Sequence, residues 1–157
     1  MEQRKDKEKT LSAGTLLFVA CWAAYCASYL GRINYTAALT AIVADGMFSK
    51  SHAGFIGTVY FFCYGAGQIF SGILGDRVSP YKMIGAGLAG TVCANIIMPL
   101  CSSSYITMSI IWGLNGIVQS MLWTPVLYII ATVLPEEQRS RACLHIASSF
   151  PIGSLLS

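Results

Sequence analysis

The chain has 157 residues, of which 55% are hydrophobic and only 11% are charged, and its mean hydropathy is +0.61. A soluble globular domain carries roughly 25% charged residues, and seven of the charged residues present lie between Glu2 and Lys9. The few that remain cannot cover the surface of a water-soluble domain, so the composition excludes a soluble enzyme and a nucleic-acid-binding protein.

Long uncharged runs predict an all-α membrane protein. They separate Lys9 from Arg32, Lys50 from Asp76, and Lys82 from Glu136. A span needs about 20 mostly apolar residues, so the third run holds two spans, with a turn at the polar residues 101–104. A last apolar run begins at Ala142. We expect a charged cytoplasmic tail over residues 1–10 and a transmembrane bundle over 11–157, with five spans near 11–42, 54–75, 83–100, 106–134 and 142–157, the last one truncated.

The Lys and Arg residues near the span ends predict the orientation in the membrane, because cytoplasmic loops carry an excess of them. One set of loops, together with the N-terminal tail, holds Arg4, Lys5, Lys7, Lys9, Arg77, Lys82, Arg139 and Arg141. The opposite loops hold only Lys50. We therefore expect a multi-pass protein of the cell membrane (plasma or inner), embedded in the lipid bilayer with its N-terminus in the cytoplasm.

No residue pattern favours a metal, a cofactor or enzyme chemistry. The six cysteines lie in or beside apolar runs without a Cys-x-x-Cys pair, and the two histidines, His52 and His145, do not cluster with them. Such cysteines are usually small packing residues. Paired carboxylates and nucleophile–base pairs are absent from the predicted spans. We expect no metal site, no cofactor and no enzyme activity.

Small residues recur at four-residue spacing in two spans, as Gly67, Ser71 and Gly75 and as Ala86, Gly90 and Ala94. Lipid provides no hydrophobic force between helices, so close backbone approach at small residues favours their association. These stripes predict helix packing.

Arg32 differs from every other residue of the first span, which is otherwise apolar or weakly polar. A charge at mid-bilayer costs at least ~2.5–3.5 kcal/mol, so such residues usually face a cavity or a partner. Tyr25 and Tyr29 share its helix face. A guanidinium there suits a carboxylate or a phosphate, which it grips with two parallel hydrogen bonds. Alternatively, the first span ends near Leu30 and Arg32 reaches lipid headgroups.

Polar and aromatic stripes on the second and fourth spans predict one pocket shared with Arg32 and filled with water. The expected substrate-binding residues are Arg32, Tyr25, Tyr29, Tyr60, Tyr64, Gln68, Asn115 and Gln119. The expected ligand is a small anionic molecule.

The loop after the second span carries a second candidate feature. Gly72 and Gly75 permit a neighbouring helix to come close, and Pro80 fixes a tight loop. Asp76 beside a helix end can accept hydrogen bonds from a neighbouring helix N-terminus and latch one conformation; alternatively it lies in a solvated turn. The expected gating residues are Gly72, Asp76, Arg77 and Lys82.

This loop resembles the signature loop of the major facilitator superfamily through Gly72, Leu74, Asp76, Arg77 and Lys82. The first span is similar to the organophosphate:phosphate antiporter branch, which includes glycerol-phosphate and hexose-phosphate carriers, through Tyr29, Arg32, Asn34 and Tyr35. Ser79 and Pro80 fit the same branch, and so do Gln119, Trp123 and Pro125 in the fourth span. In that branch the first-helix Arg contacts the substrate phosphate, and Arg32 occupies the matching position. The resemblance covers about residues 24–157.

Two departures from the branch leave both phosphate and carboxylate as candidates for the anionic group of the substrate. Gln68 stands where the branch has a Lys, and of the fifth-helix signature only Arg139, Ile152 and Gly153 remain.

The resemblance implies the N-terminal part of a transporter with two halves and a substrate site between them. The C-terminal half is then the missing partner, and we expect this chain alone not to transport. The expected function is secondary active transport of a small organic anion by alternating access. A transporter-like sensor that signals to a partner is the alternative, and a membrane assembly protein is a third.

Overall fold

The computed structural model describes the backbone of residues 2–156 and the side chains of residues 14–155. In this part of the chain the elements are six helices, with no strand: α1 (Glu2–Ala44), α2 (Lys50–Gly75), α3 (Pro80–Leu100), α4 (Tyr105–Val133), α5 (Glu136–Ala147) and α6 (Ser149–Leu156). Among the residues whose side chains are described, four stretches are long and apolar enough to cross a membrane, namely Gly14–Ala44 of α1 and the whole of α2, α3 and α4. The prediction of an all-α membrane protein is confirmed.

The region of the expected fifth span forms two short helices. The first of them, α5, begins at Glu136, well before Ala142, because Pro135 precedes it and two glutamates occupy its first turn. Carboxylates there are favourable next to the positive end of the helix dipole. A prediction based on apolar runs leaves these charged residues out, so it places the start of the helix too late. The helix is interrupted at Ser148, and Pro151 has no backbone N–H to continue the bonding pattern.

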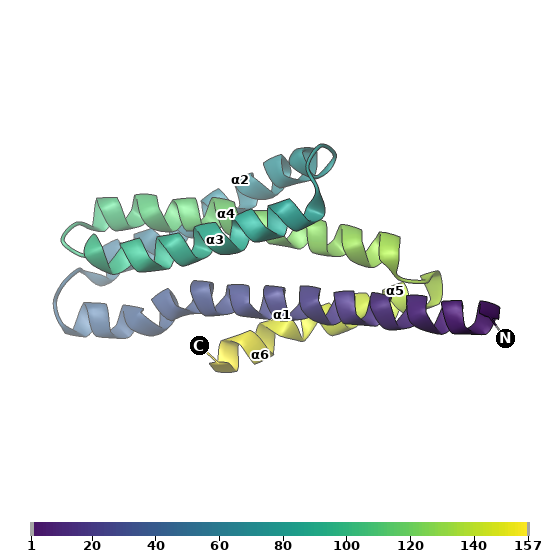
Figure 1. The fold of residues 1–157 in the computed structure, drawn as a ribbon. Coiled ribbons are helices and arrows are strands. Elements are labelled where there is room, and N and C mark those ends of the chain that lie inside the picture. Colours follow the sequence, from purple (N-terminus) through teal and green to yellow (C-terminus); the bar gives the residue numbers. More distant parts are fainter. Residues whose placement is uncertain (1, 157) are drawn as a thin grey trace.

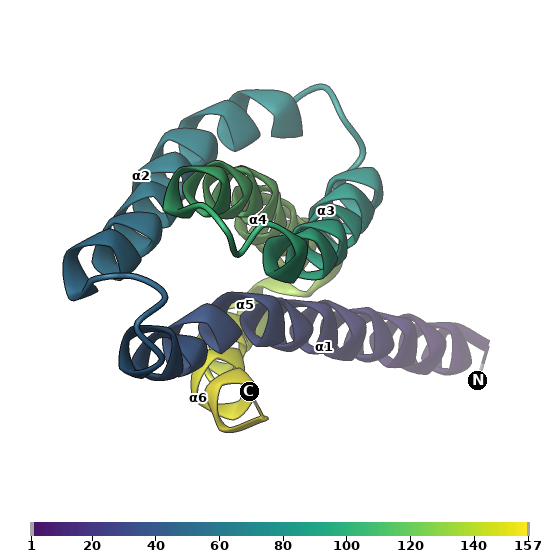
Figure 2. The ribbon, with the colours of Figure 1, turned by 90° about the vertical axis from the view of Figure 1, so that its left-hand side faces the viewer.

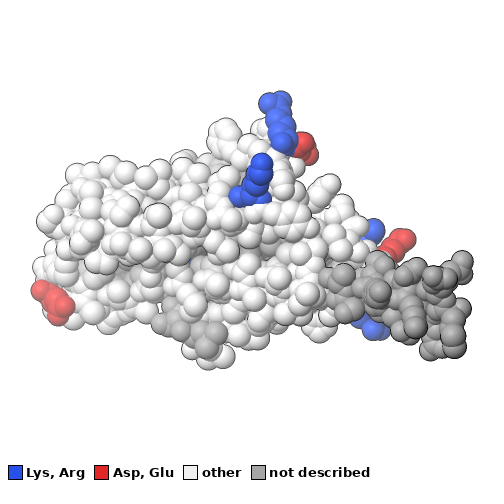
Figure 3. All heavy atoms as spheres, viewed as in Figure 1, with Lys and Arg blue, Asp and Glu red and all other residues white. Residues whose placement is uncertain are grey.

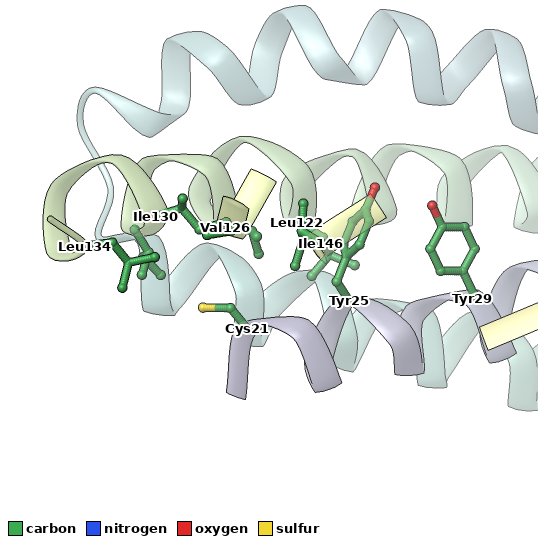
Figure 4. Close-up of a cluster of buried hydrophobic side chains, with 10 residues drawn as sticks. Cys21, Tyr25, Tyr29, Leu122, Val126, Ile130, Leu134 and Ile146 are labelled. Carbon is green, nitrogen blue, oxygen red and sulfur yellow. The ribbon is translucent and has the colours of Figure 1, made fainter. Parts of the chain in front are cut away.

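The helices form two groups, one of α2, α3 and α4 and the other of α1 and α6 (Figures 1 and 2). In Figure 2, α2 and α3 lie on either side of α4, whereas α1 runs beneath them and has α6 against its other face. A hydrophobic cluster joins the two groups (Figure 4), with buried residues Cys21, Tyr25, Tyr29, Leu122, Val126, Ile129, Ile130, Leu134, Ala142 and Ile146. The core therefore connects α1 to α4 and α5.

Small residues permit the close contact between α2 and α4. A Cβ atom on Gly116 would lie 2.5 Å from the Tyr60 carbonyl oxygen, and one on Gly67 would lie 2.5 Å from Ser120 Oγ. The hydroxyl groups of Ser71 and Ser120 are hydrogen-bonded at 3.0 Å. Gly67 and Ser71, which the spacing assigned to helix packing, thus lie in this interface.

The packing face of α3 includes Gly90 of the predicted stripe, where a Cβ atom would lie 2.8 Å from Val118 Cγ1 of α4, but it does not include Ala86. Ala86 is exposed, whereas Gly87 is buried, and a Cβ atom there would lie 2.9 Å from the Val118 carbonyl oxygen of α4. Ala94 is buried as expected.

Most of the face drawn in Figure 3 is uncharged, and its charged side chains lie towards the helix ends. Large apolar side chains are exposed along the helices, including Phe62 at 78% and Phe70 at 72%. Such a surface suits lipid or further apolar protein segments rather than water.

Candidate functional site

Arg32 lies within the α1 span, half-buried, and aromatic rings surround its side chain. The distances from its guanidinium carbon to the ring centroids are 4.5 Å for Tyr64, 5.3 Å for Tyr60, 5.7 Å for Phe61 and 5.8 Å for Tyr29. A guanidinium within about 6 Å of a ring is attracted by the negative face of the π-system. The Arg32 Nε atom is buried and has no hydrogen-bond partner. The rings hold the cation in place, and one of its donors remains unused.

No carboxylate lies in the middle of a membrane span among the residues whose side chains are described. Among the residues whose side chains are described, the acidic ones lie at helix ends or in loops: Asp45, Asp76, Glu136 and Glu137. Within the same residues, no group of three His, Cys, Asp or Glu side chains is placed to hold a metal ion. The positive charge of Arg32 is therefore not neutralised by a span carboxylate, and an anionic ligand would supply the missing charge.

An open cavity of about 510 Å³ lies beside the Arg32 rings, between α1, α2, α4 and the α5–α6 region. Its walls are Tyr25, Tyr29, Tyr64, Gln68, Trp123, Ile146, Ala147 and Phe150. Figure 4 shows Tyr25 and Tyr29 projecting from α1 towards α4. Because the rings of Tyr29 and Tyr64 both contact the guanidinium and line the cavity, they connect Arg32 to this space. Four of the predicted substrate-binding residues line one cavity.

Three others lie in helix interfaces instead. Asn115, Tyr60 and Gln119 are 0%, 1% and 3% exposed. The Tyr60 hydroxyl donates a hydrogen bond to Gln119 Oε1 at 2.8 Å, and Gln119 Nε2 donates to the Ser28 carbonyl at 3.2 Å. Asn115 Nδ2 donates to the Gly31 carbonyl at 3.1 Å. These residues fasten α1 to α4 and α2 immediately beside Arg32.

Sequence reasoning missed a residue of this network on α3. Asn95 Nδ2 donates to the Gly31 carbonyl at 3.0 Å, and Asn95 Oδ1 accepts a hydrogen bond from Asn34. Asn95 is the one amide side chain in the third predicted span, residues 83–100, and its isolation there could have identified it. Phe61 and Phe150, which complete the aromatic surroundings, carried no signal because phenylalanine is common in any span.

The expected gating loop lies at the α2–α3 turn. Asp76 is exposed and ends α2, with its backbone N–H bonded to the Leu74 carbonyl. Arg77 and Lys82 are also exposed. Gly72 and Asp76 border a small cavity of about 60 Å³ towards α4. Within the described residues no donor bonds to the Asp76 carboxylate, so its latch role stays a prediction.

Comparison with known proteins identifies the family of this chain. The family profile described as Major Facilitator Superfamily matches residues 21–157. A probable hexose phosphate transport protein of Chlamydia pneumoniae is 29% identical over 140 residues, covering 89% of this chain and 30% of that protein. The membrane sensor protein UhpC of Escherichia coli (strain K12) is 31% identical over 103 residues, covering 66% and 23%. No solved structure matches significantly.

A third relative is the glycerol-3-phosphate transporter of Bacillus subtilis (strain 168), which is 30% identical over 112 residues, covering 69% of this chain and 25% of that protein. The chain thus spans less than a third of the length of these relatives. The resemblance to hexose-phosphate and glycerol-phosphate carriers, inferred from Arg32 and its neighbours, is confirmed. The family profile covers most of the described chain, and the chain belongs to the major facilitator superfamily.

Proposed function

We propose that this chain is the N-terminal part of a secondary transporter that carries a small phosphorylated organic anion by alternating access. The observation that supports it most is the environment of Arg32, a cation in a membrane span with aromatic neighbours and a buried, unpartnered Nε. Relatives named as hexose phosphate and glycerol-3-phosphate transport proteins favour phosphate over carboxylate. A guanidinium binds a phosphate through two parallel charge-assisted hydrogen bonds.

The residues around Arg32 have two roles in this proposal. Tyr25, Tyr29, Tyr64 and Gln68 line the cavity and contact the organic part of the substrate. Tyr60, Asn115 and Gln119 hold the helices in position around the cation. A C-terminal half, outside this chain, would close the cavity from the opposite side, and the loop at Asp76 would gate the movement of the two halves.

The test is substrate binding to the complete transporter in detergent, with and without the change Arg32→Gln. Hydrogen bonds to charged groups contribute about 1.5–3 kcal/mol, so losing the bonds of Arg32 lowers the affinity for a hexose phosphate or glycerol 3-phosphate at least tenfold. Arg139→Gln is the matched control, because it removes the same charge outside the cavity. Unchanged affinity in the Arg32 variant would exclude this residue from the site.

A sensor is the second candidate, since a membrane sensor protein is among the relatives. A sensor would bind the same phosphorylated ligand through Arg32 and associate with a signalling partner. Flux into liposomes separates the two functions: saturable uptake by the complete protein supports the transporter, whereas binding without uptake supports the sensor.

We also propose that the protein lies in the cell membrane with its N-terminus in the cytoplasm. The distribution of Lys and Arg between the two sets of loops supports this orientation. A cysteine-reactive, membrane-impermeant label would test it in a variant whose six native cysteines are replaced by serine. In that variant Lys50→Cys is expected to react in intact cells and Lys82→Cys only after lysis.

A further inference from the structure

A separate cavity of about 300 Å³ lies between the start of the α1 span and α5. It is lined by Thr15, Phe18, Leu134, Gln138, Arg141, Ala142 and His145. The cavity beside Arg32 shares none of these residues. The substrate site therefore does not account for it.

One side of this cavity is cationic and polar. Arg141 and His145 are one helical turn apart on α5, and Gln138 precedes Arg141 by three residues, so all three share a face. Both Arg141 and His145 are exposed, and no described residue forms a hydrogen bond or ion pair with either side chain. Arg139 differs, because its Nε donates to the Leu134 carbonyl at 3.0 Å. The donors of Arg141 and His145 are thus available to a ligand.

The other side is apolar and firmly packed. Leu134 and Ala142 are 7% and 6% exposed and belong to the main hydrophobic cluster, against which Phe18 also packs. The cavity combines a cationic wall with an apolar wall, which is the chemistry of a phospholipid: a phosphate group attached to glycerol and hydrocarbon.

The position of the cavity along the membrane normal agrees with this ligand. The uncharged run of α1 begins after Lys9, less than two helical turns before Thr15, and α4 ends at Val133, next to Leu134. The cavity therefore lies near the ends of both spans, close to the membrane surface. Lipid phosphates are concentrated at that level, and basic pockets between spans at the cytoplasmic side bind anionic headgroups.

We propose that this cavity binds the headgroup of an anionic phospholipid. Arg141 and His145 donate hydrogen bonds to the phosphate oxygens, and Gln138 bonds to the polar headgroup beyond it. The glycerol and first methylene groups of the lipid lie against Phe18 and Leu134. A bound lipid would link α5 to α1, and it leaves the substrate cavity open.

The test is lipid retention by the full chain in detergent. The protein is mixed with micelles that contain phosphatidylglycerol or phosphatidylcholine, separated by gel filtration, and its bound lipid is quantified by mass spectrometry. We expect about one retained phosphatidylglycerol per chain and at least tenfold weaker retention of phosphatidylcholine. Arg141→Gln lowers phosphatidylglycerol affinity about tenfold, as expected for one charge-assisted interaction. Arg139→Gln, the same change on the same helix, leaves it unaltered.

Three results would overturn the proposal. Equal retention of both lipids would show that the charge does not matter, and equal losses in the Arg139 and Arg141 variants would show that the surface attracts anions without a site. Displacement of phosphatidylglycerol by millimolar inorganic phosphate would assign the cavity to a soluble anion. Circular dichroism checks that each variant is folded, and His145→Gln repeats the test if Arg141→Gln does not fold.

Discussion

Gly116 lies on α4 where this helix crosses α2, and its replacement by alanine tests whether the contact of these two helices positions the candidate site. A Cβ atom at this position would lie 2.5 Å from the Tyr60 carbonyl oxygen and 3.1 Å from the Tyr64 amide nitrogen. Both are backbone atoms, which cannot rotate away as a side chain does. To reach an ordinary contact distance, the two helices must separate by about 1 Å at this point.

The expected loss of stability follows from two opposing effects. Overpacking of a tight contact costs about 1–3 kcal/mol, whereas alanine in a helix is favoured over glycine by about 1 kcal/mol. We expect a net destabilisation of up to about 2 kcal/mol. For a chain of this size each 1 kcal/mol shifts Tm by roughly 2–4 °C. Gly65→Ala on α2 is the matched control, because nothing lies within 4 Å of its Cβ position, and its Tm is expected to stay equal or rise.

The same change tests the site, since the displaced backbone carries the Tyr60 and Tyr64 rings that contact Arg32. In the complete transporter, Gly116→Ala is expected to weaken substrate binding, whereas Gly65→Ala is not. Thermal unfolding in detergent by circular dichroism and equilibrium binding of a hexose phosphate provide the two measurements. Equal Tm values for the two variants would refute the reasoning, because the same methyl group would then be tolerated at a closed and at an open position.

Two further changes separate structure from gating. Gln119→Leu leaves the buried Tyr60 hydroxyl without a partner and removes the second hydrogen bond to the Ser28 carbonyl, so we expect a loss of about 1–3 kcal/mol. Denaturant unfolding measures this loss, and adding Tyr60→Phe to this variant is expected to cost little more if the two side chains act together. Asp76→Asn changes an exposed side chain and is expected to alter stability by no more than about 0.5 kcal/mol. If Asp76 is a latch, uptake by the complete transporter falls in this variant while Tm is preserved, and unchanged uptake would assign Asp76 to a solvated turn.

The helical fold was predictable because each bilayer span needs a long uncharged run, and such runs are visible without knowing any contact. The predicted spans overlap α1 to α4, but the polar ends of helices escaped the same reasoning. Lys50 begins α2 and Glu136 begins α5, since a helix continues beyond the apolar core wherever capping and dipole interactions support it. The break at Ser148 depends on the local effect of Pro151, which hydropathy does not register.

The sequence indicated which side chains gather around Arg32, but not which of them line the cavity and which lie between helices. Helical periodicity shows which side chains share a face, but it does not show which neighbouring helix that face contacts. Tyr64 and Gln68 lie on the cavity wall, whereas Tyr60, on the same predicted stripe, is buried against Gln119. The stripe follows one side of α2, and the helix passes from an open region to a closed interface along its length.

Polar side chains in a membrane span are commonly interpreted as the lining of a pathway, and Asn115 and Gln119 argue for a different role. Each amide donates to a backbone carbonyl of α1, at Gly31 and at Ser28. A carbonyl within a helix already accepts one bond and has a second lone pair, so these contacts add a link between helices without removing a bond from α1. The first of these carbonyls belongs to the residue immediately before Arg32. A cation that must meet a substrate needs a fixed backbone, because its long side chain is otherwise free to move. The amides of α4 provide this anchor, and their effect on a bound anion would therefore act through the position of Arg32.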